Sequence, residues 1–150
     1  MADSSIPTAA DWGDPGDDLD RLWARGFLSG KTRAEAVRHF EDRGLSASEA
    51  LAFAPPVPFR YYMIAFMDYV MGPARSSGFG LDAANAASAF LGLIAEKLEN
   101  CYEDILPIMP ELMPACRYVA SHQEDYGASE GIYGSFSRRL RRIEELYSVP

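Results

Sequence analysis

Acidic side chains are the residues of this chain whose type and spacing most clearly indicate a chemistry. Residues 96–130 contain eight acidic residues and only two basic ones, Lys97 and Arg117. The eight are Glu96, Glu99, Glu103, Asp104, Glu111, Glu124, Asp125 and Glu130. Because this stretch also has helical apolar periodicity, we expect the carboxylates to lie on a folded surface. A fixed acidic surface attracts cationic partners and repels nucleic acids and anionic membranes.

One tyrosine stands out within this acidic region. Tyr126 follows Glu124 and Asp125 and precedes Gly127, in a stretch that we expect to be a polar loop. A tyrosine beside carboxylates suits a contact with a basic protein, because its ring supplies rigid area and its hydroxyl a polar group. The same ring could instead fold back over the core. The predicted partner-binding residues are Glu103, Asp104, Glu111, Glu124, Asp125 and Tyr126.

Metal binding is a weaker interpretation of the same carboxylates. Glu96, Glu99 and Glu103 share one helical stripe and could ligate a hard cation, but a solvated helix face is the preferred interpretation. The two histidines, His39 and His122, fit no metal-binding motif. We therefore predict no metal site.

Nucleophilic chemistry is not indicated either. Cys101 and Cys116 fall on apolar helix faces, which favours buried, reduced thiols over reactive ones. Two cysteines do not make a disulfide framework, although a single bridge between adjacent helices stays open. No cofactor motif is found, because the glycine-rich Ser76–Gly80 lacks a phosphate-loop lysine. We predict a protein without catalysis or cofactor.

Composition places these residues on a small, acidic domain. The 150 residues suit one hydrophobic core, and the net charge is −8. The first residues show no signal-peptide pattern, and no apolar run is long enough to span a membrane. We therefore expect a cytoplasmic protein that binds neither membrane nor nucleic acid.

The periodicity of apolar residues predicts an all-α fold without strands. We expect a flexible acidic segment over residues 1–17 and a single domain over 18–150, built as a compact bundle of six or seven helices. Two capping boxes, Thr32 to Glu35 and Ser46 to Glu49, predict two short helices separated by a left-handed Gly44. Further helices are expected at 18–30, 59–71, 82–105, from 110 onward and at 132–147, with a connector at 72–80.

Two basic features have alternative interpretations. Residues 32–53 resemble a helix-turn-helix in outline, yet their second helix carries no side chain suited to reading base edges. The final helix contains Arg138, Arg139, Arg141 and Arg142. We expect these arginines to form a solvated face, paired with nearby glutamates or docked on the acidic region of this chain or a second copy.

The sequence therefore supports one leading hypothesis and two others. The leading one is a small cytosolic acidic module that occludes a basic partner protein, as immunity or antitoxin-type inhibitors do; a homodimer is possible. The first alternative is a helical enzyme or ligand-binding protein with a pocket lined by Tyr62, Met63, Phe66 and Tyr102. The second is a helix-turn-helix regulator.

Overall fold

A computed structural model describes residues 5–74 and 81–148, apart from the side chains of Leu45 and Leu81. Six helices have ten or more residues: α2 (Leu19–Leu28), α3 (Arg33–Phe53), α4 (Pro56–Tyr69), α6 (Leu81–Asn100), α8 (Met109–Ser121) and α10 (Phe136–Ser148). The single turns are α1 (Ala9–Trp12), α7 (Tyr102–Ile105) and α9 (Glu130–Tyr133). Short π and 3₁₀ segments are η1 (Val70–Ala74), η2 (Leu106–Ile108) and η3 (Gln123–Tyr126). The described residues contain no strand, which confirms the all-α class; the count of six or seven helices is not confirmed.

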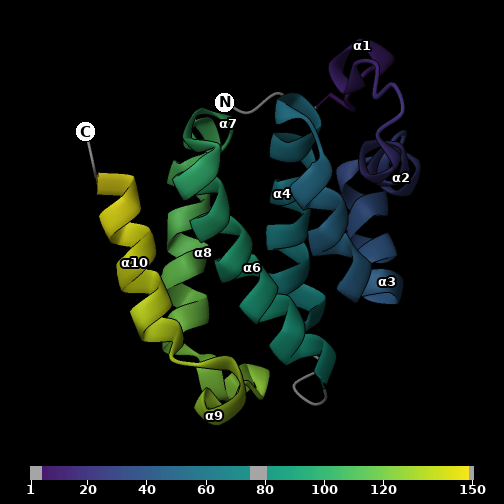
Figure 1. Cartoon of the computed structure of the whole chain (residues 1–150). Helices are drawn as coiled ribbons and strands as arrows, with labels where there is room; N and C mark the ends of the chain where they lie inside the picture. The colour runs from purple at the N-terminus through teal and green to yellow at the C-terminus, as the bar shows by residue number, and fades with distance from the viewer. Residues whose placement is uncertain (1–4, 75–80, 149–150) are drawn as a thin grey trace.

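Helix α4 lies at the centre of the bundle, between α3 and α6, with α8 and α10 further out (Figure 1). It begins after Pro55, and Pro56 is tolerated in its first turn because that amide needs no intrahelical partner. Its buried side chains include Phe59, Tyr62 and Phe66, each with no exposed surface. The helix expected over residues 59–71 is thus present, with its start three residues earlier than predicted.

Helix α3 replaces the two short helices that the capping boxes predicted. The first box forms as expected: the Thr32 amide donates to Glu35 Oε1 at 2.9 Å, and the Glu35 amide donates to Thr32 Oγ1 at 3.1 Å. The second box caps no helix start, because α3 continues through residues 46–49. One non-helical residue, Arg43 (φ −133°, ψ 43°), kinks the helix instead of ending it.

The prediction of a left-handed Gly44 is wrong, because its φ is not positive. A Cβ at this position would stand 2.9 Å from the hydroxyl oxygen of Tyr69. Glycine is therefore needed where α3 and α4 approach each other, and not for a turn.

Two other helix boundaries differ from prediction. The helix expected over 82–105 stops at Asn100, because Cys101 adopts a non-helical conformation (φ −141°, ψ 49°) before the single turn α7. The last helix begins at Phe136 instead of residue 132, and Ile132 is 76% exposed. Residues 75–80 of the expected connector lie outside the described residues.

The side chain of Gln123 explains the late start of α10. Its Nε2 donates to the carbonyl oxygens of Ala128 (2.9 Å) and Gly134 (2.7 Å), and its Oε1 accepts from the Phe136 amide (2.9 Å). One amide side chain thus fixes the connection between α8 and α10, in which Gly134 (φ 76°) ends α9 before α10 begins.

The described part of the N-terminal segment packs against the domain. Thr8 and Asp11 form a capping box around α1, and Trp12 is 6% exposed. The Trp12 ring lies 6.4 Å from the ring of Tyr62 between centroids. The prediction of a separate flexible acidic segment is therefore not confirmed.

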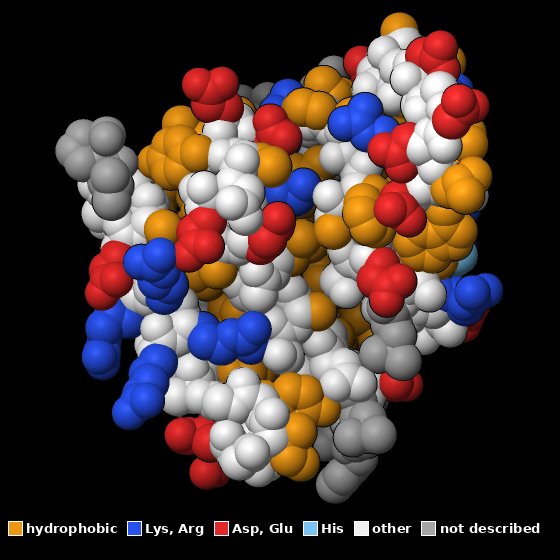
Figure 2. All heavy atoms as spheres, viewed as in Figure 1, with side chains coloured by type: hydrophobic (Ala, Val, Ile, Leu, Met, Phe, Trp, Pro, Cys, Tyr) orange, Lys and Arg blue, Asp and Glu red, His pale blue; other side chains and the backbone are white. Residues whose placement is uncertain are grey.

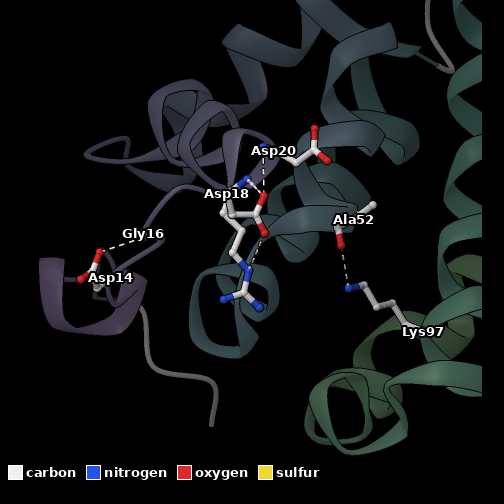
Figure 3. A network of polar contacts seen from close by, with 7 residues as sticks. Asp14, Gly16, Asp18, Asp20, Ala52 and Lys97 are labelled. Atoms are coloured by element: carbon white, nitrogen blue, oxygen red, sulfur yellow. Dashed lines mark hydrogen bonds and ion pairs between the residues drawn. The ribbon is translucent and has the colours of Figure 1, made fainter.

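A buried lysine connects three helices. Lys97 of α6 is 4% exposed, and its Nζ donates to the Ala52 carbonyl at 3.1 Å (Figure 3). Ala52 belongs to the last turn of α3, where carbonyl groups lack intrahelical donors. The ammonium also lies 4.8 Å from the ring centroid of Phe59, in the first turns of α4. Lys97 therefore caps α3 and holds it against α4 and α6.

Candidate functional site

The predicted acidic residues fall into two separate groups. Glu103 and Asp104 lie on α7, and Glu111 lies in the first turn of α8, at the top in Figure 1. Glu124 and Asp125 lie on η3, which follows the other end of α8. Since α8 has 13 residues, it separates the groups by about 20 Å along its axis. The structure thus brings together only the first three.

Tyr126 is corrected from a surface contact to a core residue. It has no exposed surface, and its hydroxyl donates to the Val70 carbonyl at 3.0 Å. Left-handed Gly127 (φ 71°) ends η3 directly behind it and turns the chain away. The ring therefore folds back over the core, which is the second of the two interpretations given above, and Tyr126 does not present a surface to a partner.

A pocket of about 910 Å³ adjoins the α7–α8 end of the molecule. Four segments form its walls: the N-terminal segment, the start of α3, the first half of α4, and the turn from η2 into α8. The residues that line it are Ser5, Ile6, Thr8, Asp11, Arg33, Val57, Arg60, Tyr61, Ile64, Pro107, Ile108, Pro110 and Glu111. We call this the α4–α8 pocket. Glu111 is the predicted site residue that lines it.

Its apolar wall has both buried and exposed parts. Ile64 and Ile108 are 4% and 3% exposed and form a closed base. Ile6 and Val57 are 37% and 41% exposed, and Leu106, beside the lining residue Pro107, is 39% exposed. Large apolar side chains that stay partly in water around a hollow indicate a contact surface.

Both arginines of the pocket are held in position. Arg33 forms a two-pronged ion pair with Asp68, and its backbone amide donates to the Tyr61 hydroxyl at 3.0 Å. This pairing raises the pKa of Arg33. Arg60 donates through Nη1 to the Asp104 carbonyl at 3.1 Å and has no carboxylate within ion-pair distance among the described residues. Its remaining N–H groups can therefore donate to a bound molecule.

Acidic and basic side chains both line the pocket. Asp11 and Glu111 line it, Asp68 pairs with Arg33, and Asp104 holds Arg60 through its backbone. One carboxylate oxygen of Asp11, Oδ2, already accepts from both the amide and the hydroxyl of Thr8, whereas the exposed Glu111 forms no ion pair within 4 Å among the described residues. Two carboxylates and two guanidinium groups line the pocket, and Asp68 already pairs with Arg33, so the lining suits a ligand of mixed charge.

One serine–histidine contact could be mistaken for a catalytic pair. Ser121 Oγ lies 2.9 Å from His122 Nδ1, but the same ring nitrogen lies 2.8 Å from the Tyr118 carbonyl, to which Ser121 Oγ also donates. These bonds satisfy the end of α8, and the imidazole stacks on the Tyr118 ring at 3.8 Å between centroids. The arrangement is that of a helix C-terminus and not of an activated nucleophile.

The two cysteines differ in burial: Cys116 is buried, as predicted, whereas Cys101 is only half-buried. Cys101 and Cys116 are both free, and burial raises the pKa of the Cys116 thiol to about 12, so this thiol stays protonated. In the described part of the chain no group of three metal-ligating side chains is close enough to hold an ion.

The pocket of the ligand-binding alternative does not form where it was predicted. Tyr62, Met63 and Phe66 have no exposed surface and belong to the core, and the Tyr102 hydroxyl donates to the Tyr147 carbonyl at 3.3 Å. Because α4 is covered by neighbours on that face, the hollow opens along the face that bears Arg60, Tyr61 and Ile64.

The four arginines of α10 have three different environments: an ion pair, a half-buried hydrogen bond and solvent. Arg142 pairs with Glu99 of α6 at 2.7 Å, as expected for docking on the chain's own acidic region. Arg139 is half-buried and donates to Ser88 Oγ at 2.8 Å, in the space left by Gly92. Desolvation lowers the pKa of Arg139. Arg138 and Arg141 are exposed.

Comparison with known proteins adds no functional information. No protein-family model, no curated protein and no solved structure matches the chain. Among the described residues no helix is both long enough and apolar enough to cross a membrane. The helix-turn-helix interpretation of residues 32–53 stays a hypothesis. In the structure its two segments form one helix that is kinked at Arg43.

Sequence reasoning missed most of the pocket. Its polar residues come from positions 5–11, 33, 60–61 and 111, so no local pattern relates them. One local signal was present: the proline-rich stretch at 55–58 leads directly into Arg60 and Tyr61, two large polar side chains at the start of an otherwise apolar helix.

Proposed function

We propose that the protein is a non-catalytic cytosolic module that binds and occludes a basic partner protein, in the manner of an immunity or antitoxin-type inhibitor. The observation that carries this proposal is the α4–α8 pocket, which combines partly exposed apolar side chains with a rim that carries Glu111, unpaired in the described part of the chain, and continues into the acids of α7. An apolar side chain of the partner enters the pocket beside Val57, and its basic neighbours meet Glu111. Glu103 and Asp104 extend the acidic rim along α7.

The held arginines support a protein partner. A guanidinium fixed by a backbone carbonyl, as Arg60 is, can donate its remaining hydrogens to main-chain carbonyls of an extended partner segment. Such bonds add orientation without requiring a negative charge on the partner. The pocket thus accommodates a basic segment despite its two arginines.

The test compares charge reversals at the two ends of α8. The partner is captured from host lysate and purified, and association rates are measured for the wild type, Glu111→Lys and Glu124→Lys at low and high salt. Glu111→Lys is expected to slow association about tenfold at low salt, with the loss shrinking at high salt. Glu124→Lys changes the net charge equally but lies at the other end of α8, so its effect is expected to be small. Equal slowing by both variants, or slowing by Glu124→Lys alone, would remove the pocket from the interface.

A second candidate function is the binding of a small molecule in the same pocket. Its volume of about 910 Å³ and its few oriented polar groups lie within the range of ligand sites. This function predicts that a compound screen finds a molecule that raises the melting temperature of the wild type but not of Arg60→Met. A stabilising compound that acts equally on both would not bind through Arg60.

A further inference from the structure

Helix α2 carries an apolar stripe that faces water. Leu19 is 77% exposed, Leu22 45% and Trp23 40%. These positions, with Gly26, follow the spacing i, i+3, i+4, i+7, which places them on one side of a helix. The opposite side packs on the domain through Ala24, Phe27 and Leu28, which are buried. Figure 2 shows hydrophobic side chains gathered over α2 with acidic side chains next to them.

Gly26 has no explanation within the chain. Its φ is not positive, and a Cβ added there would meet nothing within 4 Å. A glycine inside a helix is unfavourable relative to alanine, so the position is suboptimal for the isolated domain. On the exposed stripe, the missing side chain leaves room for a second helix backbone to approach closely. The stripe can therefore accept a closely packed second helix at this position.

The charges around α2 are self-complementary. Residues 14–20 contain four aspartates and no base, whereas residues 21–31 contain Arg21, Arg25 and Lys31 and no acid. Asp18 caps the start of α2, and Arg25 lies in its last turn without an ion pair in the described part of the chain. When two such helices lie antiparallel, the acidic half of each meets the basic half of the other, and their helix dipoles are opposed.

We propose that α2 is a docking surface for a second copy of this chain, in an antiparallel two-fold pairing that crosses between Leu22 and Trp23, so that Leu19 of each copy packs over Gly26 of the other. The Leu19, Leu22 and Trp23 side chains of each copy pack against the α2 helix of the other. Asp18 of one copy faces Arg25 of the other, and the reverse holds by symmetry. The surface lies on α2 and does not include residues that line the α4–α8 pocket, so the proposal is independent of the proposed function.

The test is sedimentation velocity of the purified full chain over a range of concentrations. A monomer–dimer equilibrium is expected, and Leu19→Ser is expected to weaken it about tenfold or more, because each dimer loses two buried leucines. Ile132→Ser is the matched control, since Ile132 is 76% exposed on α9 and outside the stripe. Its dimerisation is expected to equal that of the wild type.

A second variant separates docking from folding. Gly26→Ala is expected to raise the melting temperature of the dilute monomer, because nothing crowds a Cβ there, and at the same time to weaken the dimer. A wild type that stays monomeric up to about 1 mM would overturn the proposal, since even a millimolar dissociation constant would then be excluded. A dimer that Leu19→Ser and Gly26→Ala leave unchanged would overturn it as well. A monomeric protein whose α2 stripe instead binds a basic amphipathic peptide would identify a different occupant and contradict the pairing.

Discussion

Replacing Lys97 by methionine tests whether a buried cation holds three helices together. Methionine keeps most of the volume of the lysine stem but removes the donor to the Ala52 carbonyl and the charge above the Phe59 ring. A hydrogen bond from a charged donor contributes about 1.5–3 kcal/mol, and a partly desolvated cation–π contact about 0.5–2 kcal/mol. Both stabilising contacts are opposed by the desolvation cost of an ammonium group that is only 4% exposed, and the substitution removes this cost.

We expect Lys97→Met to lower the free energy of unfolding by about 1–3 kcal/mol, because the carbonyl at the end of α3 is left without its donor. Lys97→Ala should cost about 2 kcal/mol more, since it also removes roughly three buried methylene groups. Urea unfolding followed by circular dichroism measures both values. Each kcal/mol corresponds to a fall of about 2–4 °C in melting temperature for a chain of this size.

A double-mutant cycle isolates the contact with Phe59. Lys97→Met is combined with Phe59→Leu, and the coupling energy is expected to be about 0.5–2 kcal/mol if the ring stabilises the cation. A Lys97→Met variant as stable as the wild type, or more stable, would refute the reasoning. It would show that the desolvation cost of the ammonium group exceeds the stabilisation from its contacts with the Ala52 carbonyl and the Phe59 ring.

Two further predictions concern stability. Burial lowers the pKa of His39, so the folded state favours the neutral imidazole. The contribution of this neutral imidazole to the free energy of unfolding is complete above the unfolded pKa of about 6.5. It is lost as the pH falls through the lower folded pKa. Urea unfolding between pH 7.5 and 5 should therefore show a smaller loss for His39→Gln than for the wild type, and parallel losses would contradict this assignment. Gly44→Ala should destabilise the fold by about 1–3 kcal/mol because its Cβ meets the Tyr69 hydroxyl, and Tyr69→Phe in the same chain should recover part of the loss; a Gly44→Ala melting temperature equal to the wild type would show that the two helices are not in close contact there.

The helices themselves were largely predictable, because their signals are local. The Thr32 capping box, the apolar run that became α4, and the periodicity of α2 each act within a few residues. The same local rules failed at Ser46, where a second capping-box pattern lies inside α3. A capping box stabilises a helix start only where the chain is not already helical, and packing of α3 on α4 keeps it helical there.

The candidate site was predicted only in part, because burial and proximity are not local properties. Tyr126 and Glu124 are two residues apart, yet one is buried under η1 and the other is exposed. Glu111 and Arg60 are 51 positions apart and line the same pocket. Nothing in the residue types near either position could distinguish these outcomes.

The sequence by itself determined the all-α class, the positions of the main helices and the acidic charge, since backbone propensity, apolar periodicity and ionisable side chains are properties of short segments. Only the tertiary structure decided which acids share a surface, which tyrosine is buried and where a pocket opens. The physical reason is that each of these depends on helix–helix contacts between distant segments. Lys97 illustrates this dependence: a charged residue in the sequence becomes a buried helix cap only because α3 ends against α6.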